Sequence, residues 1–265
     1  MRKCTRRRLG FVPILMLCLV QSASMFSITE TTEGIESVNA LRRAQQEPKR
    51  SWVSKLSKDE FRKLLGAMPS PGTLEPGSPP FPLTYPSAID WRNKDGHNWV
   101  TAIKNQGQCR SCVAFAAVAT LESLVRIELG QPNKQIDLSE MDVFHCGCGY
   151  CCGAAWDLLS AGIYLYNQGA PDEECFPYQP QDLPCENNCS NSLLRSVKIS
   201  NHGLIYGQEN FKTCVAIAPI MAVMNVYEDF WQFEGGTICQ HSWGELLGNH
   251  AVCIIGYNTT GPIDY

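Results

Sequence analysis

Apolar residues follow a helical period in one long stretch of the chain, between Cys112 and about Glu128. Gly130 comes just after this stretch, and glycine commonly ends a helix because it accepts a left-handed backbone conformation. We predict a helix over residues 112–128 and, between residues 143 and 169, a cysteine-rich turn followed by a second helix.

The second half of the chain carries a different pattern, in which short apolar runs rich in valine and isoleucine predict strands. These runs cover residues 197–199, 220–226 and 251–257. A helical first half followed by a strand-rich second half is typical of the α+β class. We therefore expect an α+β fold with two subdomains and a cleft between them.

A short helix is predicted well ahead of this domain, within residues 51–66. Ser57 and Glu60 have the spacing of a capping box, the apolar residues that follow form one face, and Gly66 ends the pattern. Residues 67–86 contain seven prolines, which indicates an exposed linker open to proteases. A short helix on a detachable arm is what a propeptide would look like.

The N-terminus has the pattern of a secretory signal peptide over residues 1–24. Basic residues at positions 2–8 precede an apolar run at 9–20, and small residues at 22–24 offer a cleavage site. A transmembrane helix needs about 20 apolar residues, so an uncleaved anchor is the less favoured alternative. We expect entry into the secretory pathway, with the lysosome, a vacuole or the extracellular space as destination, and no stable membrane anchor.

Composition narrows the possible partners. Apolar residues make up 44% of the chain and charged residues 18%, as in an ordinary globular protein. From residue 84 onward there are 9 lysines and arginines against 19 aspartates and glutamates, a net charge of −10. Nucleic acid is excluded as the expected partner, because its phosphates require a basic face.

Cysteine is frequent, with 14 residues, of which Cys4 and Cys18 would leave with the signal peptide. In an exported protein the remaining twelve are expected to form disulfides. The cluster between His145 and Cys152 has some likeness to a zinc knuckle, but disulfides are the favoured interpretation and no metal is expected. Sequons at Asn188 and Asn258 predict a glycoprotein.

Cys112 is the strongest candidate for chemistry, because it lies where a loop enters a predicted helix. The free amides and the positive end of a helix lower the pKa of a thiol and favour the nucleophilic thiolate. His250 directly precedes an apolar strand that would hold its ring and is the candidate base. A structural disulfide cysteine and a buried structural histidine are the alternative interpretations.

Residues 106–115 resemble the active-site segment of papain and the cathepsins. In that family the histidine follows the nucleophile by roughly 130–150 residues, and His250 lies 138 residues after Cys112. The segment at residues 90–92 is similar to the start of the mature enzymes. Further similar segments follow in the family's order, at Leu138-Ser-Glu140, Cys146, Cys151, Trp156 and residues 226–236. The likeness to papain-type (family C1) cysteine peptidases covers residues 51–265.

The resemblance implies a signal peptide over 1–24, a propeptide over 25–84 and a papain-like peptidase domain over 85–265. It implies a helical left lobe and a barrel-like right lobe, whose last strands we expect to be missing. Cys112 would be the nucleophile, His250 the base, and Gln106 an oxyanion donor. Protein or peptide substrates, inhibition by the chain's own propeptide, a monomeric state and no cofactor are also implied.

Within the family, the chain is most similar to cathepsin B. Its propeptide is short, and Cys175 and Cys185 resemble the edges of the cathepsin B occluding loop, whose two histidines restrict that enzyme to removing dipeptides. No histidine lies between them, so endopeptidase activity is expected. By resemblance, the expected disulfides join Cys109 to Cys151 or Cys152, Cys146 to Cys189, and Cys175 to Cys185.

Three departures from the family pattern oppose this interpretation. Arg110 replaces a glycine beside the nucleophile, Val113 replaces an aromatic residue, and the asparagine that orients the family's histidine is missing, because the chain ends at Tyr265. The segment at residues 241–244 precedes His250 and is not the family's asparagine segment. The alternative is therefore a catalytically inactive binding protein with a papain-like fold, or a non-functional fragment.

Overall fold

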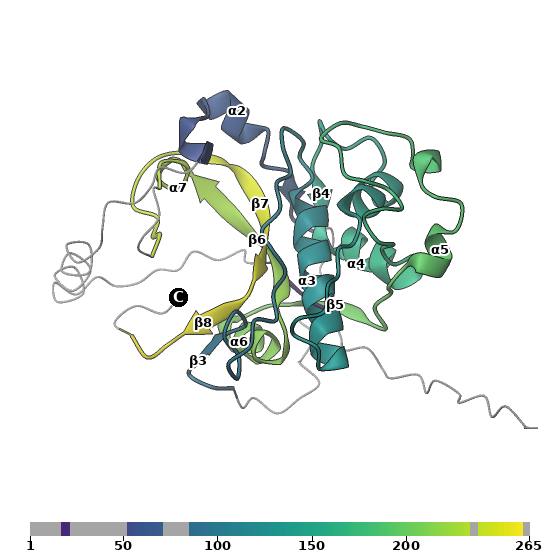
Figure 1. Cartoon of the computed structure of the whole chain (residues 1–265). Coiled ribbons are helices and arrows are strands. Elements are labelled where there is room, and N and C mark those ends of the chain that lie inside the picture. Colours follow the sequence, from purple (N-terminus) through teal and green to yellow (C-terminus); the bar gives the residue numbers. More distant parts are fainter. Residues whose placement is uncertain (1–16, 22–51, 71–84, 234–237, 262–265) are drawn as a thin grey trace, which may run out of the picture.

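The computed structural model describes residues 17–21, 52–70, 85–233 and 238–261. Two lobes lie side by side, one built mainly of helices and the other around a curved sheet (Figure 1). The helices are η1 (Trp52–Lys55), α2 (Lys58–Arg62), α3 (Cys112–Leu129), η2 (Asp142–Cys146), α4 (Leu158–Asn167), η3 (Cys185–Asn187), α5 (Ser192–Arg195), α6 (Gln208–Ile217) and α7 (Glu228–Trp231). The strands are β1 (Leu17–Gln21), β2 (Ala67–Met68), β3 (Ala88–Asp90), β4 (Trp156–Asp157), β5 (His202–Ile205), β6 (Ile220–Tyr227), β7 (Leu246–Ile254) and β8 (Gly256–Asn258).

Helix α3 forms the spine between the lobes and confirms the long helix predicted from the sequence. It ends at Gly130, whose left-handed backbone (φ 62°) lets its N–H bond the carbonyls of Arg126 and Ile127. The helix is buried almost all round, and its side chains pack on α4 as well as on β6 and β7. Because both lobes pack on α3, its first residue lies at their junction.

The main sheet is open, with strand order β5-β1-β6-β7. Strands β6 and β7 are antiparallel over eight paired positions and include the predicted strand 220–226. The prediction at 197–199 is wrong, since Val197 forms only an isolated bridge to Ala170 and the strand begins at His202. Strand β7 begins at Leu246, so His250 lies inside a strand and does not precede one as expected.

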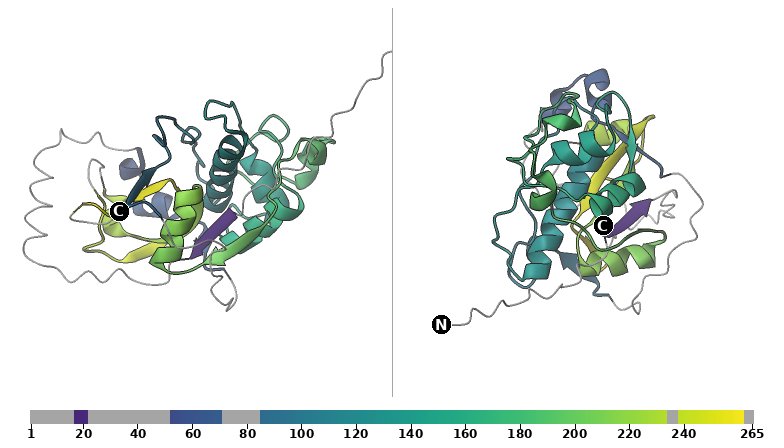
Figure 2. Two further views of the ribbon diagram at one scale, coloured as in Figure 1. Left: turned by 90° about the horizontal axis from the view of Figure 1, so that it is seen from below. Right: turned by 90° about the vertical axis from the view of Figure 1, so that its right-hand side faces the viewer.

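Strand β1 belongs to the segment predicted as a signal peptide. It pairs in parallel with β5 on one side and with β6 on the other, in the middle of the sheet (Figure 2). The other residues of 1–24 lie outside the described part of the chain, as do most residues of the predicted polar arm and linker, so the signal peptide stays a prediction. Within the described residues, no helix combines the length and apolar character needed to cross a membrane.

Four disulfides fasten the helical lobe, and two of the expected pairings are wrong. Cys109 pairs with Cys152, as expected, and Cys148 pairs with Cys151. The structure joins Cys146 to Cys185 and Cys175 to Cys189. The resemblance implied the other combination, Cys146 with Cys189 and Cys175 with Cys185. The cause is local: the N–H of Cys189 bonds the carbonyl of Cys175 at 3.2 Å, which brings these two residues together.

A buried charge cluster ties the loop before α3 to the helical lobe. The Lys104 ammonium lies 3.0 Å from a Glu122 carboxylate oxygen and 2.7 Å from one of Glu140, and both carboxylates are almost wholly buried. Burial acts to lower the pKa of Lys104, but Glu140 and Glu122 outweigh it, and the pKa is raised. The cation is therefore fixed in place by two acids that have little access to water.

Replacing Lys104 by methionine is expected to destabilise the protein by about 3–5 kcal/mol, because breaking a buried ion pair leaves uncompensated charge in the interior. Urea unfolding measures the loss. The matched control is Lys94→Met, whose partner Asp95 is exposed, with an expected cost below about 1 kcal/mol. Equal unfolding midpoints for the two variants would contradict this account of the cluster.

Candidate active site

Cys112 is the first residue of α3 and lies at the junction of the two lobes. Its thiol is free and almost completely buried. The sulfur faces the sheet, because the backbone N–H of Ala251 on β7 donates to it over 3.5 Å. A cysteine of the helical lobe thus touches the strand of the other lobe that carries the predicted base.

His250 is the residue just before Ala251 on β7, opposite Met224 of β6. Burial lowers the pKa of its ring to about 4, while an interaction with the Leu64 carbonyl acts in the opposite direction. Among the described residues, its Nδ1 atom is buried without a hydrogen-bond partner. The ring is therefore neutral in this arrangement, and no described group orients it through Nδ1.

Gln106 completes the predicted set. Its side-chain amide donates to the Leu64 carbonyl at 3.0 Å and to the Cys109 carbonyl at 2.8 Å. The Leu64 carbonyl thus meets both Gln106 and His250, and the N–H of the nearby Gly66 reaches the sulfur of Cys112. All three predicted residues contact the same short segment of the predicted propeptide.

That segment fills the cleft by backbone contacts. Strand β2 pairs in parallel with β4, and the N–H of Trp156 donates to the Gly66 carbonyl at 2.8 Å. The group of this segment that reaches the Cys112 sulfur is the backbone N–H of Gly66. A Cβ on Gly66 would overlap the Arg110 carbonyl oxygen, which explains why glycine stands there.

The arm that carries this segment docks through apolar contacts. Phe61, Leu64 and Leu65 are buried against Val226 and Leu247 of the sheet, and each such side chain contributes about 1.5–3 kcal/mol when fully buried. The helix preceding them has the predicted capping box, with Ser57 and Glu60 bonded to each other. Figure 1 shows α2 above α7 and the start of β7.

The expected depression of the Cys112 pKa is absent from this closed arrangement. Burial raises the pKa of the thiol, and it outweighs the backbone N–H groups of Ala251, Gly66 and Val113, which act to lower it. The covering segment removes water from both the sulfur and His250. With a neutral thiol and a neutral imidazole, the closed cleft contains no thiolate and is unreactive.

Tyr178 was missed as part of this site. Its hydroxyl donates to the Gln106 backbone carbonyl at 2.7 Å and accepts from the Ser111 hydroxyl at 2.6 Å, while its ring packs edge-on against Phe115. Tyr178 therefore braces both the loop that carries Gln106 and the start of α3. Its place in the segment after Cys175 gave no sign of this contact, which depends on how that loop folds back.

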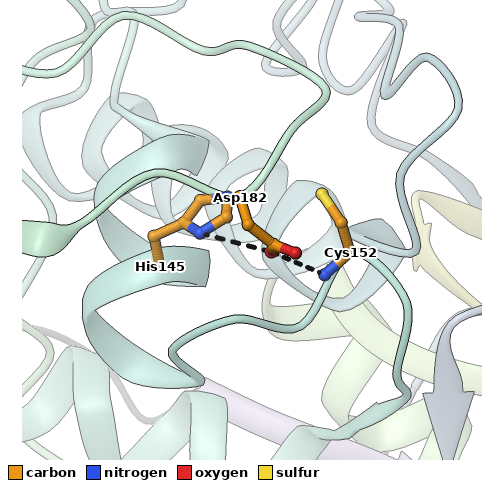
Figure 3. A group of neighbouring side chains, drawn as sticks. All are labelled: His145, Cys152 and Asp182. Atoms are coloured by element: carbon orange, nitrogen blue, oxygen red, sulfur yellow. Dashed lines mark hydrogen bonds and ion pairs between the residues drawn. The ribbon is translucent and has the colours of Figure 1, made fainter.

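A metal site between His145 and Cys152 is the less favoured interpretation of the sequence, and the geometry around His145 bears on it. Figure 3 shows the His145 ring facing the Asp182 carboxylate, which also accepts from the N–H of Cys152 at 2.9 Å. The Cys152 sulfur is bonded to Cys109, so it is not a thiolate ligand. The group supplies only an imidazole and one carboxylate, which favours the disulfide interpretation.

Two lobes that meet at a free cysteine, facing a histidine-bearing strand, place the protein in the α+β class. Residues 85–265 match the family described as papain family cysteine protease. Ananain from Ananas comosus is 31% identical over 176 residues, 66% of this chain and 48% of ananain. Cathepsin B from Dictyostelium discoideum is 29% identical over 252 residues, 81% of this chain and 77% of that protein.

Among solved structures, proCathepsin B S9 from Trypanosoma congolense aligns with a TM-score of 0.65 at 21% identity, over 89% of this chain and 86% of that one. The chain belongs to the papain family of cysteine proteases. Its two-lobed α+β fold is papain-like, as the sequence predicted, with an open sheet in place of a closed barrel. The chain spans about half the length of ananain.

Replacing Gly66 by alanine is expected to open the cleft, because the added Cβ overlaps the backbone of Arg110. Alkylation of Cys112 by iodoacetamide, followed by mass spectrometry, should become roughly tenfold faster or more, the effect of about 1.4 kcal/mol lost from the closed state. The control is Gly153→Ala, where a Cβ meets nothing within 4 Å. Equal rates in the two variants would show that the segment does not protect Cys112.

Proposed function

We propose that the chain is the zymogen of a cysteine endopeptidase. The observation that carries the proposal is the free Cys112 thiol between α3 and β7, with the Gln106 amide beside it and the chain's own residues 64–68 across the cleft. Family membership supports the same chemistry. Residues 1–24 would be the signal peptide and 25–84 the propeptide, removed from the domain at 85–265.

The proposed reaction begins with transfer of the Cys112 proton to His250. The thiolate attacks the scissile carbonyl carbon, and the oxyanion is held by the Gln106 amide and the Cys112 backbone N–H. His250 then gives its proton to the leaving amine, which departs as the C–N bond breaks. Water, deprotonated by His250, hydrolyses the thioester and restores the thiol.

Endopeptidase activity is favoured over dipeptide removal because of the loop between Cys175 and Cys185. It contains no histidine that could bind the C-terminal carboxylate of a substrate. Its Tyr178 is turned inward toward Gln106 and Ser111. Secretory localisation, glycosylation and a monomeric state belong to the same proposal and rest on the sequence.

An inactive papain-fold binding protein is the second candidate, and one observation favours it. His250 Nδ1 is buried without a partner among the described residues, whereas a catalytic imidazole needs a group that fixes its tautomer and orientation. Residues beyond position 261 lie outside the described part of the chain. Activity therefore decides between the two candidates.

Cys112→Ser and His250→Ala are each expected to reduce hydrolysis of a fluorogenic peptide by at least about 10³-fold in kcat, as for a nucleophile and its base. The control is Cys239→Ser, a free cysteine away from the cleft. Covalent labelling by an epoxysuccinyl inhibitor is expected on Cys112 alone. A folded, secreted product that shows neither turnover nor labelling would establish the binding-protein alternative.

Acid is expected to loosen the docked arm. The Lys58 ammonium bonds the carboxylates of Glu228 and Glu245, and this bond lowers the pKa of both acids below 4.5. A depressed carboxyl pKa means that the contact stabilises the closed form above pH 4.5 and is lost as pH falls through the lowered pKa. Arg62 adds a second pair with Glu245, at 3.0 Å.

Reactivity of Cys112 toward dithiodipyridine, measured relative to Gly66→Ala at each pH, should therefore rise severalfold between pH 6 and pH 3.5. The Glu228→Gln/Glu245→Gln variant should already be reactive at pH 6. Asp59→Asn serves as the control, because Asp59 is exposed and, among the described residues, pairs with Arg62 of its own helix and with no residue of the sheet lobe. Protection that is unchanged by acid, or by the double substitution, would refute the role of these pairs.

A further inference from the structure

Arg110 lies two residues before Cys112, where the similar segments of the family carry glycine. Its backbone is held firmly: the N–H donates to the Cys152 carbonyl at 3.2 Å, and the neighbouring Cys109 is disulfide-bonded to Cys152. Its φ is not positive, so an L-residue is accepted there without strain. The chain thus places a long cation at a rigid point of the active-site loop.

The Cβ atom of Arg110 lies close to the residue that covers the Cys112 sulfur. Gly66, the covering residue whose N–H reaches the Cys112 sulfur, also lies against Arg110. A Cβ built on Gly66 would be 2.5 Å from the Cβ of Arg110. A substrate residue that lies at the sulfur in place of Gly66 will therefore have Arg110 beside it.

The Arg110 guanidinium is unpaired within the described residues, although it is only partly exposed. The other basic groups near the helical core are engaged: Lys104 with two buried carboxylates, Arg126 with backbone carbonyls, and Arg195 with Asp172. An arginine that no acid of the described residues satisfies, beside the segment that covers Cys112, has its five donors available to a ligand.

We propose that Arg110 makes this peptidase select substrates with an aspartate or glutamate immediately before the scissile bond. This inference rests on the proposed peptidase function and adds a substrate class to it. A guanidinium binds a carboxylate through two parallel hydrogen bonds, and such a pair is stronger in a partly desolvated cleft than on an open surface. The neutral glycine of the family would give no such preference.

A steric role for Arg110 is the competing interpretation, in which only glycine fits beside it, as Gly66 does. The overlap calculated for Gly66 involves the Arg110 backbone and applies to a segment that presents an N–H to the sulfur. A substrate must present its carbonyl carbon there, so its side chain leaves the backbone along a different direction. The unpaired charge therefore favours selection by charge over exclusion by size.

The test uses the Gly66→Ala enzyme, whose cleft is expected to be open, and fluorogenic peptides that differ only in the residue before the scissile bond: Glu, Gln, Gly or Lys. At pH 6 and low salt, kcat/KM for the Glu peptide should exceed that for the Gln peptide by roughly tenfold, the effect of one good ion pair. The ratio should fall toward one at high salt. Arg110→Gln and Arg110→Gly should abolish it, whereas Arg92→Gln, an exposed arginine far from the cleft, should not.

The possible failures are distinguishable. Cleavage of the Glu and Gln peptides at equal rates would overturn the inference and leave the peptidase function standing. If only the Gly peptide is cleaved, and the Arg110→Gly variant also cleaves the Glu, Gln and Lys peptides, Arg110 has a steric role. That result would also overturn the inference. No cleavage of any peptide, together with no epoxysuccinyl labelling of Cys112, would overturn the proposed function and this inference with it.

Discussion

The contact between the start of α3 and strand β7 is the constraint on which the rest of the structure depends. It includes the sulfur of Cys112, which accepts from the backbone N–H of Ala251 at 3.5 Å. Each partner is rigid for its own reason: α3 is buried almost all round, and β7 is paired with β6 along its length. A small change in the packing of the lobes would separate the thiol from the strand that carries His250.

The same junction explains how one short segment can silence the site. Leu64 and Gly66 reach Gln106 and Cys112 through backbone groups alone, so the inhibitory contact does not depend on a particular side chain in the cleft. The affinity comes from elsewhere, chiefly from apolar side chains such as Phe61 buried against the sheet. Burial then shifts the thiol and the imidazole toward their neutral forms.

The sequence predicted those elements that are determined by residues close together in the chain. The long helix follows from its apolar period and from Gly130, and the arm helix follows from the Ser57–Glu60 capping box. The strand predicted at 197–199 failed because a short apolar run does not specify a partner; Val197 meets only Ala170.

The features that sequence could not predict depend on loops folding back in three dimensions. The exchange of partners among four cysteines follows from where the loop around Cys189 returns to Cys175. Tyr178 reaches the loop that carries Gln106 for the same reason. The raised pKa of Cys112 also has a tertiary cause, since a helix start alone would lower it, and burial at the junction of the two lobes outweighs that effect.

The most direct measurement of the central claim is the pH titration of the Cys112 thiolate, followed by its ultraviolet absorbance in the Gly66→Ala protein, whose cleft is expected to be open. A sulfur at the start of α3 that shares a proton with His250 should ionise well below the ordinary thiol pKa of about 8.5. The midpoint should move up in the His250→Ala variant. A midpoint near the ordinary value, identical in both proteins, would contradict the account.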